Sequence, residues 1–373
     1  MKTSTKRAAL VLSVASVMCA ALLGCDKKEA KRDAEDESTQ SDAGTEKASK
    51  AAGDEPELAR AVAAAAAAHP AGGVDTAGGP PASGIFAPGE ADKAFVKGAA
   101  ATLTVGGDGA EPRVLLGPGP KPGTKRSGTI DIASQSDPQQ PPIPFQFAVT
   151  YEASKAKVEG DAPAPTQVSV KISGAKINAA GVPAEMASAI GKLKGAHIDY
   201  QVSADGAASA MHTELPKGAL DPLAKDAMQG LSDFVAGVAL PFPTKPVGVG
   251  GFWMVTTRDT LLGLDVVTYR LVKVEKIDAG VATLSLGIKR YAASPAFELE
   301  GLPPDAPKTM AEFRAQAEGK VLVAPGEAFP KNVELQSLVA AALGVPELNP
   351  GPKPPQRPTM QVQTRGALTL GGT

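Results

Sequence analysis

The chain has 373 residues, of which 38 are lysine or arginine and 40 are aspartate or glutamate, so its formal net charge is −2 at pH 7. This near balance lacks the basic excess that binds nucleic-acid phosphates, and it argues against a nucleic-acid partner. Only two cysteines are present, Cys19 and Cys25, which leaves no room for a disulfide framework.

The first 24 residues have the organisation of a bacterial secretory signal peptide. Lys2, Lys6 and Arg7 form a short basic end, and the run 8–23 that follows is apolar apart from two serines. Such a run is short and alanine-rich for a membrane span but typical of a cleaved export signal. We therefore predict that residues 1–24 are a signal peptide.

The end of this segment resembles the bacterial lipobox, with Leu22, Leu23 and Gly24 directly before Cys25. The resemblance implies that Cys25 is linked by a thioether to diacylglycerol, that the chain is cut before it, and that the new amine is acylated, as with palmitate. The mature chain then has no free thiol for a disulfide, a nucleophile or a metal site. An ordinary signal peptide with a chance cysteine and an uncleaved anchor helix are the open alternatives.

Lipidation predicts the location of the chain. Several acyl chains anchor a protein stably, because each buried methylene contributes about 0.8 kcal/mol. Everything after Cys25 is then expected in the bacterial cell envelope, facing the periplasm or the cell exterior. Asp26 resembles the signal that retains lipoproteins of enteric bacteria in the inner membrane, but other lineages sort differently, so the choice between inner and outer membrane stays open.

Residues 25–84 are predicted to be a lipidated cysteine followed by a disordered linker. Mixed charges at 26–37 give way to Ser, Thr, Ala and Gly, without an aromatic side chain. This composition cannot bury enough apolar surface to offset its ordering entropy. The alanine-rich stretch 55–68 favours a short helix within it.

From about residue 85 the sequence changes to short apolar alternation interrupted by Gly and Pro. A period of two predicts antiparallel strands with one buried and one wet face. The clearest examples lie at 130–132, 145–151, 168–172, 311–323 and 362–370, the last as a closing or edge strand.

The segment 266–288 predicts a hairpin with its turn at 278–280. Its inward phase starts on Val267 but has moved to Val272 further along. This slip predicts a β-bulge near Leu271.

Two amphipathic helices are predicted between the strands. Pro183 begins the first, with Gly195 as its stop, and Asp221 caps the second before Pro222. Their apolar stripes must cover a sheet, which makes them core residues. The alternative is a hydrophobic groove lined by Met186, Ile190, Leu193, Leu231 and Phe234.

These elements predict an α+β domain at 85–373. Its sheet is predominantly antiparallel, curved or forming a half-barrel, with the two helices covering it. A division into two lobes near 216–220 is the alternative.

A longer pattern lies in the second half of the chain. The stretch LPFPTKPVGVGGFWMV at 240–255, followed by VVTYRLVKVEKIDAGVATLSL, resembles the pattern in an uncharacterised family of bacterial lipoprotein domains. The shared features are a proline-bounded helix exit, a Val-Gly turn, a strand that starts with Trp253 and a tyrosine-containing hairpin, over about 148–291. The family carries no established activity, so the resemblance implies no catalytic residue.

Histidine pairs are the only arrangement that suggests a polar site. His197 and Asp199, like His212 and Glu214, are two residues apart on predicted strands and so share a face. The phase of Ile198 puts the first pair on the wet side, and neither spacing matches known zinc patterns. We therefore expect no metal and no cofactor.

Other motifs point away from catalysis. The glycines of VGVGG at 247–251 lack the lysine and serine of a phosphate loop and precede a strand, and GTIDIASQS at 128–136 lacks a nucleophile elbow. We therefore expect that the chain is not an enzyme.

Two functions remain. The first is a non-catalytic structural or protein-interaction domain of a membrane-tethered lipoprotein in the cell envelope. The second is a carrier or chaperone that binds a lipid or other hydrophobic ligand between the sheet and its helices. The expected partners are the membrane, through the acyl anchor on Cys25, and an envelope protein or lipid of unknown identity.

Overall fold

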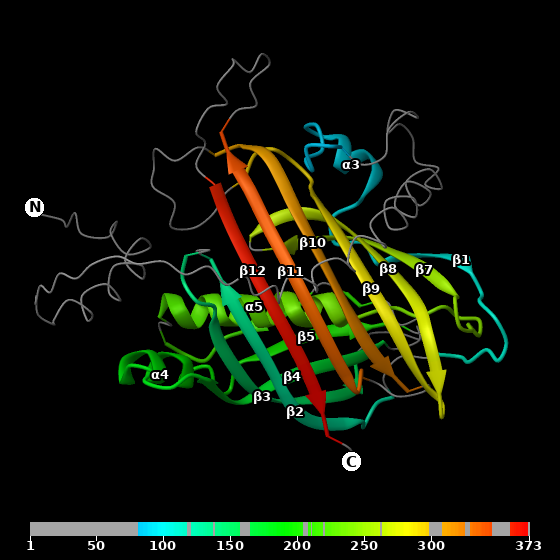
Figure 1. Cartoon of the computed structure of the whole chain (residues 1–373), viewed down its shortest axis with the longest axis horizontal. Helices are drawn as coiled ribbons and strands as arrows, with labels where there is room; N and C mark the ends of the chain where they lie inside the picture. Colours follow the sequence, from blue (N-terminus) through cyan, green and yellow to red (C-terminus); the bar gives the residue numbers. More distant parts are fainter. Residues whose placement is uncertain are drawn as a thin grey trace, which may run out of the picture. The chain divides into compact units, whose positions relative to one another are not determined.

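The structure is a computed structural model (Figure 1). It describes residues 81–117, 121–136, 139–156, 165–203, 208–209, 211–218, 221–261, 263–297, 308–324, 329–344 and 359–371. The predicted signal peptide, the lipobox with Cys25 and nearly all of the predicted linker lie outside these residues. No helix in the described part of the chain combines the length and the apolar composition needed to cross a membrane.

Strands dominate the described residues. In chain order the elements are α3 Glu90–Ala94, β1 Thr102–Gly107, β2 Lys125–Gln135, β3 Ile143–Lys155, β4 Thr166–Ile177, α4 Ala184–Gly191, β5 His197–Val202, β6 His212–Glu214, α5 Pro222–Val238, β7 Phe252–Leu261, β8 Leu264–Asp278, β9 Val281–Ala292, β10 Met310–Val323, β11 Asn332–Leu343 and β12 Thr359–Leu370.

All of these strands belong to one antiparallel sheet in the order β1-β7-β8-β9-β10-β11-β12-β2-β3-β4-β5-β6. Two runs of sequential neighbours, β2 to β6 and β7 to β12, meet where β12 pairs with β2, for example with Gly366 opposite Ile132. The sheet is open, since β1 and β6 form its two edges. The prediction of a predominantly antiparallel, β-rich domain is confirmed, whereas the edge-strand alternative for the C-terminal strand is wrong, because β12 is an interior strand.

The sheet curls around α5. On one side of the helix, Ser232 Oγ lies 3.4 Å from Thr213 Oγ1 of β6, and on another the Arg270 guanidinium of β8 donates to the Ala236 carbonyl at 3.5 Å. Nine strand-to-strand steps separate β6 from β8 in the sheet, which is about 40 Å in a flat sheet. One helix reaches both strands only if the sheet bends. Figure 1 shows α5 running across the strands behind β10 to β12.

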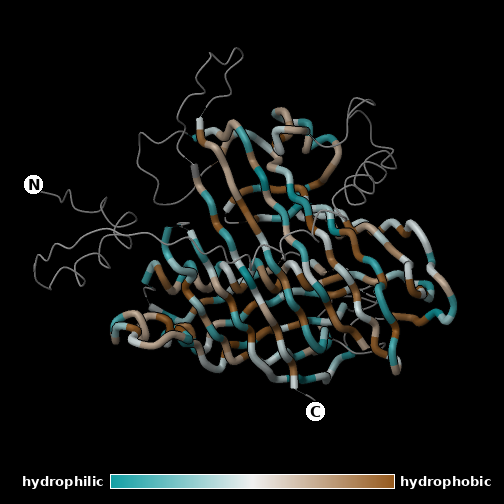
Figure 2. Tube along the Cα trace, viewed as in Figure 1, coloured by the Kyte–Doolittle hydropathy of each residue, from teal (hydrophilic) through white to brown (hydrophobic). Residues whose placement is uncertain are grey.

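Close packing against α5 depends on glycine. A Cβ atom at Gly366 of β12 would lie 2.2 Å from Phe234 Cδ2, so the bare backbone makes room for the aromatic ring. On the helix itself, Gly237 lies beside Leu335 of β11. The apolar stripe of α5 and the inner face of the sheet thus form one contiguous core. Figure 2 shows the matching alternation of hydrophobic and hydrophilic residues along the strands.

Local sequence signals explain the helix starts and the hairpin. Asp221 Oδ1 accepts a hydrogen bond from Leu223 N at 2.9 Å, so the predicted cap is confirmed. The first predicted helix begins after Pro183 as expected but ends at Gly191, before Gly195.

The predicted hairpin is confirmed as β8 and β9. The two residues between these strands, Ala279 and Gly280, have φ values of 46° and 78°, as a tight two-residue turn requires. The bulge, however, lies between Val274 and Lys276. The prediction of a bulge near Leu271 is therefore wrong.

The apparent phase slip in β8 comes from burial on both faces. Val267 and Tyr269 pack on the outer face in a second small core with Phe86 and Met254. Val272 belongs to the main core on the inner face. The strand therefore keeps one phase throughout this stretch. Both of its faces carry apolar side chains, because the chain around α3 covers the outer face.

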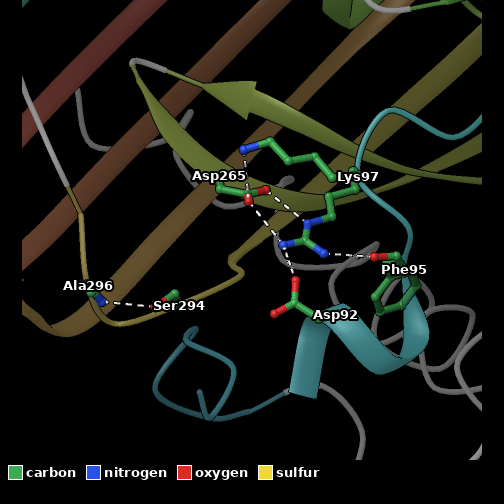
Figure 3. Close-up of polar contacts among 7 residues, drawn as sticks. Asp92, Phe95, Lys97, Asp265, Ser294 and Ala296 are labelled. Atoms are coloured by element: carbon green, nitrogen blue, oxygen red, sulfur yellow. Dashed lines mark hydrogen bonds and ion pairs between the residues drawn. The ribbon is translucent and has the colours of Figure 1, made fainter. Parts of the chain in front are cut away.

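Arg258 of β7 fixes this covering segment in place. Its Nε and Nη2 atoms donate to the two carboxylate oxygens of Asp265, each at 3.0 Å, and its Nη1 donates to the Phe95 carbonyl at 2.8 Å. Its Nη2 also lies 2.7 Å from Asp92 Oδ1 of α3, and Lys97 Nζ lies 3.3 Å from Asp265. Figure 3 shows Asp92, Asp265 and the Phe95 carbonyl in contact with this guanidinium, and the Lys97 ammonium in contact with Asp265.

The segment at 83–86 lies between β9 and β10, at the end where these two strands no longer pair. Phe313 N donates to the Ser83 carbonyl, Ala292 N to the Gly84 carbonyl, and Phe86 N to the Ala292 carbonyl, each at 2.9 Å. Gly84 is required there, since it has a φ of 74° and an added Cβ would lie 1.7 Å from the Phe313 oxygen. The segment therefore joins two strands that have moved apart.

Candidate functional site

Charged side chains interrupt the apolar inner face of the sheet beside α5. Arg270 of β8 and Arg290 of β9 are only 5% and 7% exposed, and Thr268 between them is fully buried. Arginine is rarely buried to this degree unless it is paired. We call Thr268, Arg270 and Arg290, together with the acidic neighbours Asp233 and Asp259, the arginine cluster.

Strand register brings the members of the cluster together. Thr268 lies directly opposite Arg290 on β9 and opposite Thr257 on β7. Arg270 is two residues further along β8 and so points to the same face. Directly opposed residues on one face have Cβ atoms about 4.5 to 5.5 Å apart, so these side chains are immediate neighbours.

Arg270 has partners for part of its guanidinium. Its Nη1 donates to Thr257 Oγ1 at 3.0 Å, and its Nη2 donates to Asp259 Oδ2 at 3.2 Å and to the Ala236 carbonyl of α5 at 3.5 Å. Its Nε atom is buried without a hydrogen-bond partner in the described structure, and so is the hydroxyl of Thr268. Two buried donors of the cluster are therefore unsatisfied.

Arg290 lacks a direct partner altogether. Within the described residues its guanidinium forms no hydrogen bond, and no carboxylate oxygen lies within 4.0 Å of it. Burial and the neighbouring charge of Arg270 lower the Arg290 pKa to about 10, against weaker opposing effects from Asp233 and Asp259. The side chain still carries its charge at neutral pH.

Asp233 is the acidic group that α5 contributes. Burial raises the Asp233 pKa to about 7, although the charge of Arg290 and a hydrogen bond from Gln229 oppose this shift. The Gln229 Nε2 atom donates to Asp233 Oδ1 at 2.9 Å. Burial therefore favours the neutral form of this carboxyl group, although the charge of Arg290 opposes that effect.

The predicted groove residues lie elsewhere in the same core. Ile190, Leu193 and Leu231 are fully buried, and Phe234 lies against Gly366. Met186 is partly buried and packs against this core. The helices that carry them contact each other, and α4 also contacts β4. The structure thus brings the five residues into one apolar region, and their use as a ligand groove stays a prediction.

The histidines meet at the β6 edge of the sheet. His197 Nε2 lies 3.2 Å from Asp199 Oδ2 and 3.2 Å from Glu214 Oε2. The register pairs His197 with Glu214 and Asp199 with His212, a cross-strand arrangement that the in-strand spacing did not indicate. No group of three or more side chains in the described ranges could hold a metal ion.

The arginine cluster was missed in the sequence. Its signal was present, because Thr268 and Arg270 share the phase of Val272, and Arg290 shares the phase of Ile288. Polar residues at inward positions of otherwise apolar strands indicate either a buried network or a binding site. Chemically, two guanidinium groups and a hydroxyl on one face form a donor set for an oxyanion.

Comparison of the sequence with known proteins finds no relative. No protein-family model matches the chain, and no curated protein matches it.

Proposed function

We propose that the chain is a membrane-tethered, extracytoplasmic lipoprotein of the bacterial cell envelope whose β-rich domain has a non-catalytic structural or protein-interaction role. The observation that carries the second half of this proposal is the packing of α5. Its apolar stripe forms one core with the inner face of the sheet, down to the contact of the Phe234 ring with Gly366. A sheet filled by its own helix favours a rigid body that presents surfaces over one that holds a large cargo.

The finer architecture belongs to the same proposal. We infer an α+β domain in which the sheet is a half-barrel and both α4 and α5 act as its covering helices. The contacts of α5 with β6 and β8 support the curvature, and the contacts of α4 with β4 and α5 support its covering role.

Attachment of the segment around α3 supports a load-bearing tether. The chain that directly follows the proposed linker is fixed to β7 and β8 through Arg258 and bridges β9 and β10 through Ser83 and Gly84. A pull exerted through the linker from an anchor on Cys25 would therefore act on the sheet at these strands. The proposed partners are the membrane through that anchor and an envelope protein.

The anchor is tested by Cys25→Ser in the full chain, with Cys19→Ser as the matched control. The expected result is loss of palmitate labelling and accumulation of an unprocessed precursor for Cys25→Ser, with normal labelling for Cys19→Ser. Normal processing and membrane retention of the Cys25→Ser protein would overturn the lipoprotein proposal.

The role of the domain is tested by native mass spectrometry of the full chain extracted from membranes in mild detergent. The interaction proposal expects the mass of the acylated chain alone. A reproducible extra lipid mass would instead support a carrier, the second candidate, which the unpartnered Arg270 Nε and Thr268 hydroxyl inside the sheet favour.

A further inference from the structure

We propose that the arginine cluster binds one anionic headgroup, a carboxylate or a phosphate, carried on an apolar body. The donors of this site are the side chains of Thr268, Arg270 and Arg290. The inference rests on the carrier, the second candidate above, and not on the interaction role, and it does not depend on the lipid anchor.

The arginine cluster contains hydrogen-bond donors that lack an acceptor. The Thr268 hydroxyl and Arg270 Nε are buried without partners in the described structure, and the guanidinium of Arg290 forms no hydrogen bond there. A buried donor without an acceptor destabilises a fold, and a buried charge without a partner does so more strongly. The two unsatisfied donors, Thr268 Oγ1 and Arg270 Nε, lie on β8 beside the Arg290 guanidinium, and an acceptor from outside the chain would complete them.

Charge distribution selects an anion as that acceptor. The Asp259 carboxylate is already engaged by Arg270 and by Thr257. Asp233 accepts from Gln229 and has no oxygen within 4.0 Å of Arg290. One guanidinium is thus left for one added negative charge. The planar fork of arginine fits the two oxygens of a carboxylate or a phosphate.

The residues around Arg290 indicate what kind of group would carry the anionic headgroup. The residue opposite it on β10 is Ala315, and the next residue on its own face of β9 is Ala292, so small side chains flank the guanidinium. Further along the same faces lie the buried apolar side chains of Val266, Ile288 and Phe313. These side chains are covered by the protein itself. An amphiphile with its headgroup at Arg290 would therefore have apolar neighbours for its body, and it would replace part of the contacts that now bury them.

Arg290 is the most exposed of the three donors and lies at the end of the β9–β10 pairing. Pairing of β9 with β10 ends at Arg290 and Ala315, and beyond this pair Ser83 and Gly84 bridge the separated strands. Arg290 retains 7% exposure while Thr268 has none. The anionic group would thus meet Arg290 first and Thr268 behind it.

The test measures thermal unfolding of the full chain in a neutral detergent with four probes. These are octanoate, octyl phosphate, octanol and inorganic phosphate. Octanoate or octyl phosphate is expected to raise the Tm in a saturable manner, which yields a Kd by linkage. Octanol, which lacks the charge, and inorganic phosphate, which lacks the apolar body, are expected to shift it much less. The stronger of the two anionic probes identifies a carboxylate or a phosphate as the natural headgroup.

Two variants and one control locate the binding. Arg290→Gln is expected to weaken the Kd about ten- to hundredfold, the effect of losing a charged hydrogen bond. Thr268→Val keeps charge and volume and is expected to weaken it severalfold, which provides a second readout should Arg290→Gln fold poorly. Lys289→Gln removes the same charge from the next residue of β9, on the opposite face, and is expected to leave the Kd unchanged.

The ligand-free proteins give an independent readout. Because burial and Arg270 disfavour the Arg290 charge more than Asp233 and Asp259 favour it, the ligand-free Tm of Arg290→Gln is expected to equal or exceed that of the wild type. Equal responses of wild type, Arg290→Gln and Thr268→Val to the anionic probes would overturn the proposal. A wild type that responds to neither anionic probe would also overturn the proposal. If the ligand-free Tm of Arg290→Gln were then lower than that of the wild type, Arg290 would be assigned to pairing with Asp233.

Discussion

Replacing Asp233 with asparagine should stabilise the protein, and only above mildly acidic pH. The Asp233 pKa is raised to about 7 in the fold by burial, from an ordinary value of 3.8. Below pH 4 the group is protonated in both the folded and the unfolded chain, so it contributes no difference. As the pH rises from 4 to 7 the unfolded chain releases this proton while the folded chain keeps it, and the stability of the wild type falls.

The size of this effect follows from the same shift. A raised pKa of about three units corresponds to about 4 kcal/mol at pH 8, since each unit is worth 1.36 kcal/mol. Asp233 is only partly buried by surface area, and water near the carboxyl group reduces the penalty. We therefore expect Asp233→Asn to raise the free energy of unfolding by about 2 to 4 kcal/mol at pH 8 and by nearly nothing at pH 4.

Urea unfolding at whole pH units from 4 to 8 provides the measurement. The control is Asp278→Asn on the exposed hairpin turn, where a hydrogen bond from Lys276 lowers the Asp278 pKa, so the shift has the opposite sign. A difference between Asp233→Asn and wild type that stays constant over this pH range would refute the reasoning. It would mean that the Asp233 carboxylate is ionised in the fold, paired with Arg290.

Two further predictions concern packing and the segment around α3. Gly366→Ala should lower the free energy of unfolding, measured in urea, by about 1 to 3 kcal/mol, because its Cβ would lie 2.2 Å from Phe234 Cδ2. The control Gly174→Ala should change this free energy little, since the nearest atom to its Cβ would be 3.8 Å away. Equal effects of the two substitutions would contradict the close helix contact. Arg258→Ala should make trypsin cleavage after Lys93 and Lys97 about tenfold faster or more, since it removes the bonds to Asp265 and the Phe95 carbonyl. Arg314→Ala on an exposed position of β10 is the matched control, and unchanged cleavage of Arg258→Ala would show that apolar contacts alone hold the segment.

Local signals in the sequence were sufficient for individual elements. The second helix was predicted from Asp221 and Pro222 because a cap and a fixed φ act over a few residues. The hairpin at 266–288 was predicted because alternation and a tight turn are equally local. By contrast, the pairing of β12 with β2 joins residues more than two hundred positions apart, and no local pattern specifies it.

Strands that are buried on both faces explain the features that the sequence did not predict. Val267 and Tyr269 are covered by the segment around α3, so β8 lacked the single wet face that the bulge argument assumed. The arginine cluster was missed for a related reason, since a lone arginine in an alternating strand suggests a wet face until register shows that its neighbours are core residues. Its identification needed the pairing of β7, β8 and β9.

The end of β9 connects the two parts of the molecule that matter for function. Arg290 faces α5 and the arginine cluster, and Ala292, two residues later, holds the chain that follows the proposed linker. Pairing of β9 with β10 ends at Arg290, and beyond it Ser83 and Gly84 bond to the two separated strands. A single departure from regular pairing therefore accounts for the attachment of the N-terminal segment, and it places Arg290 at the last regular pair of β9 and β10.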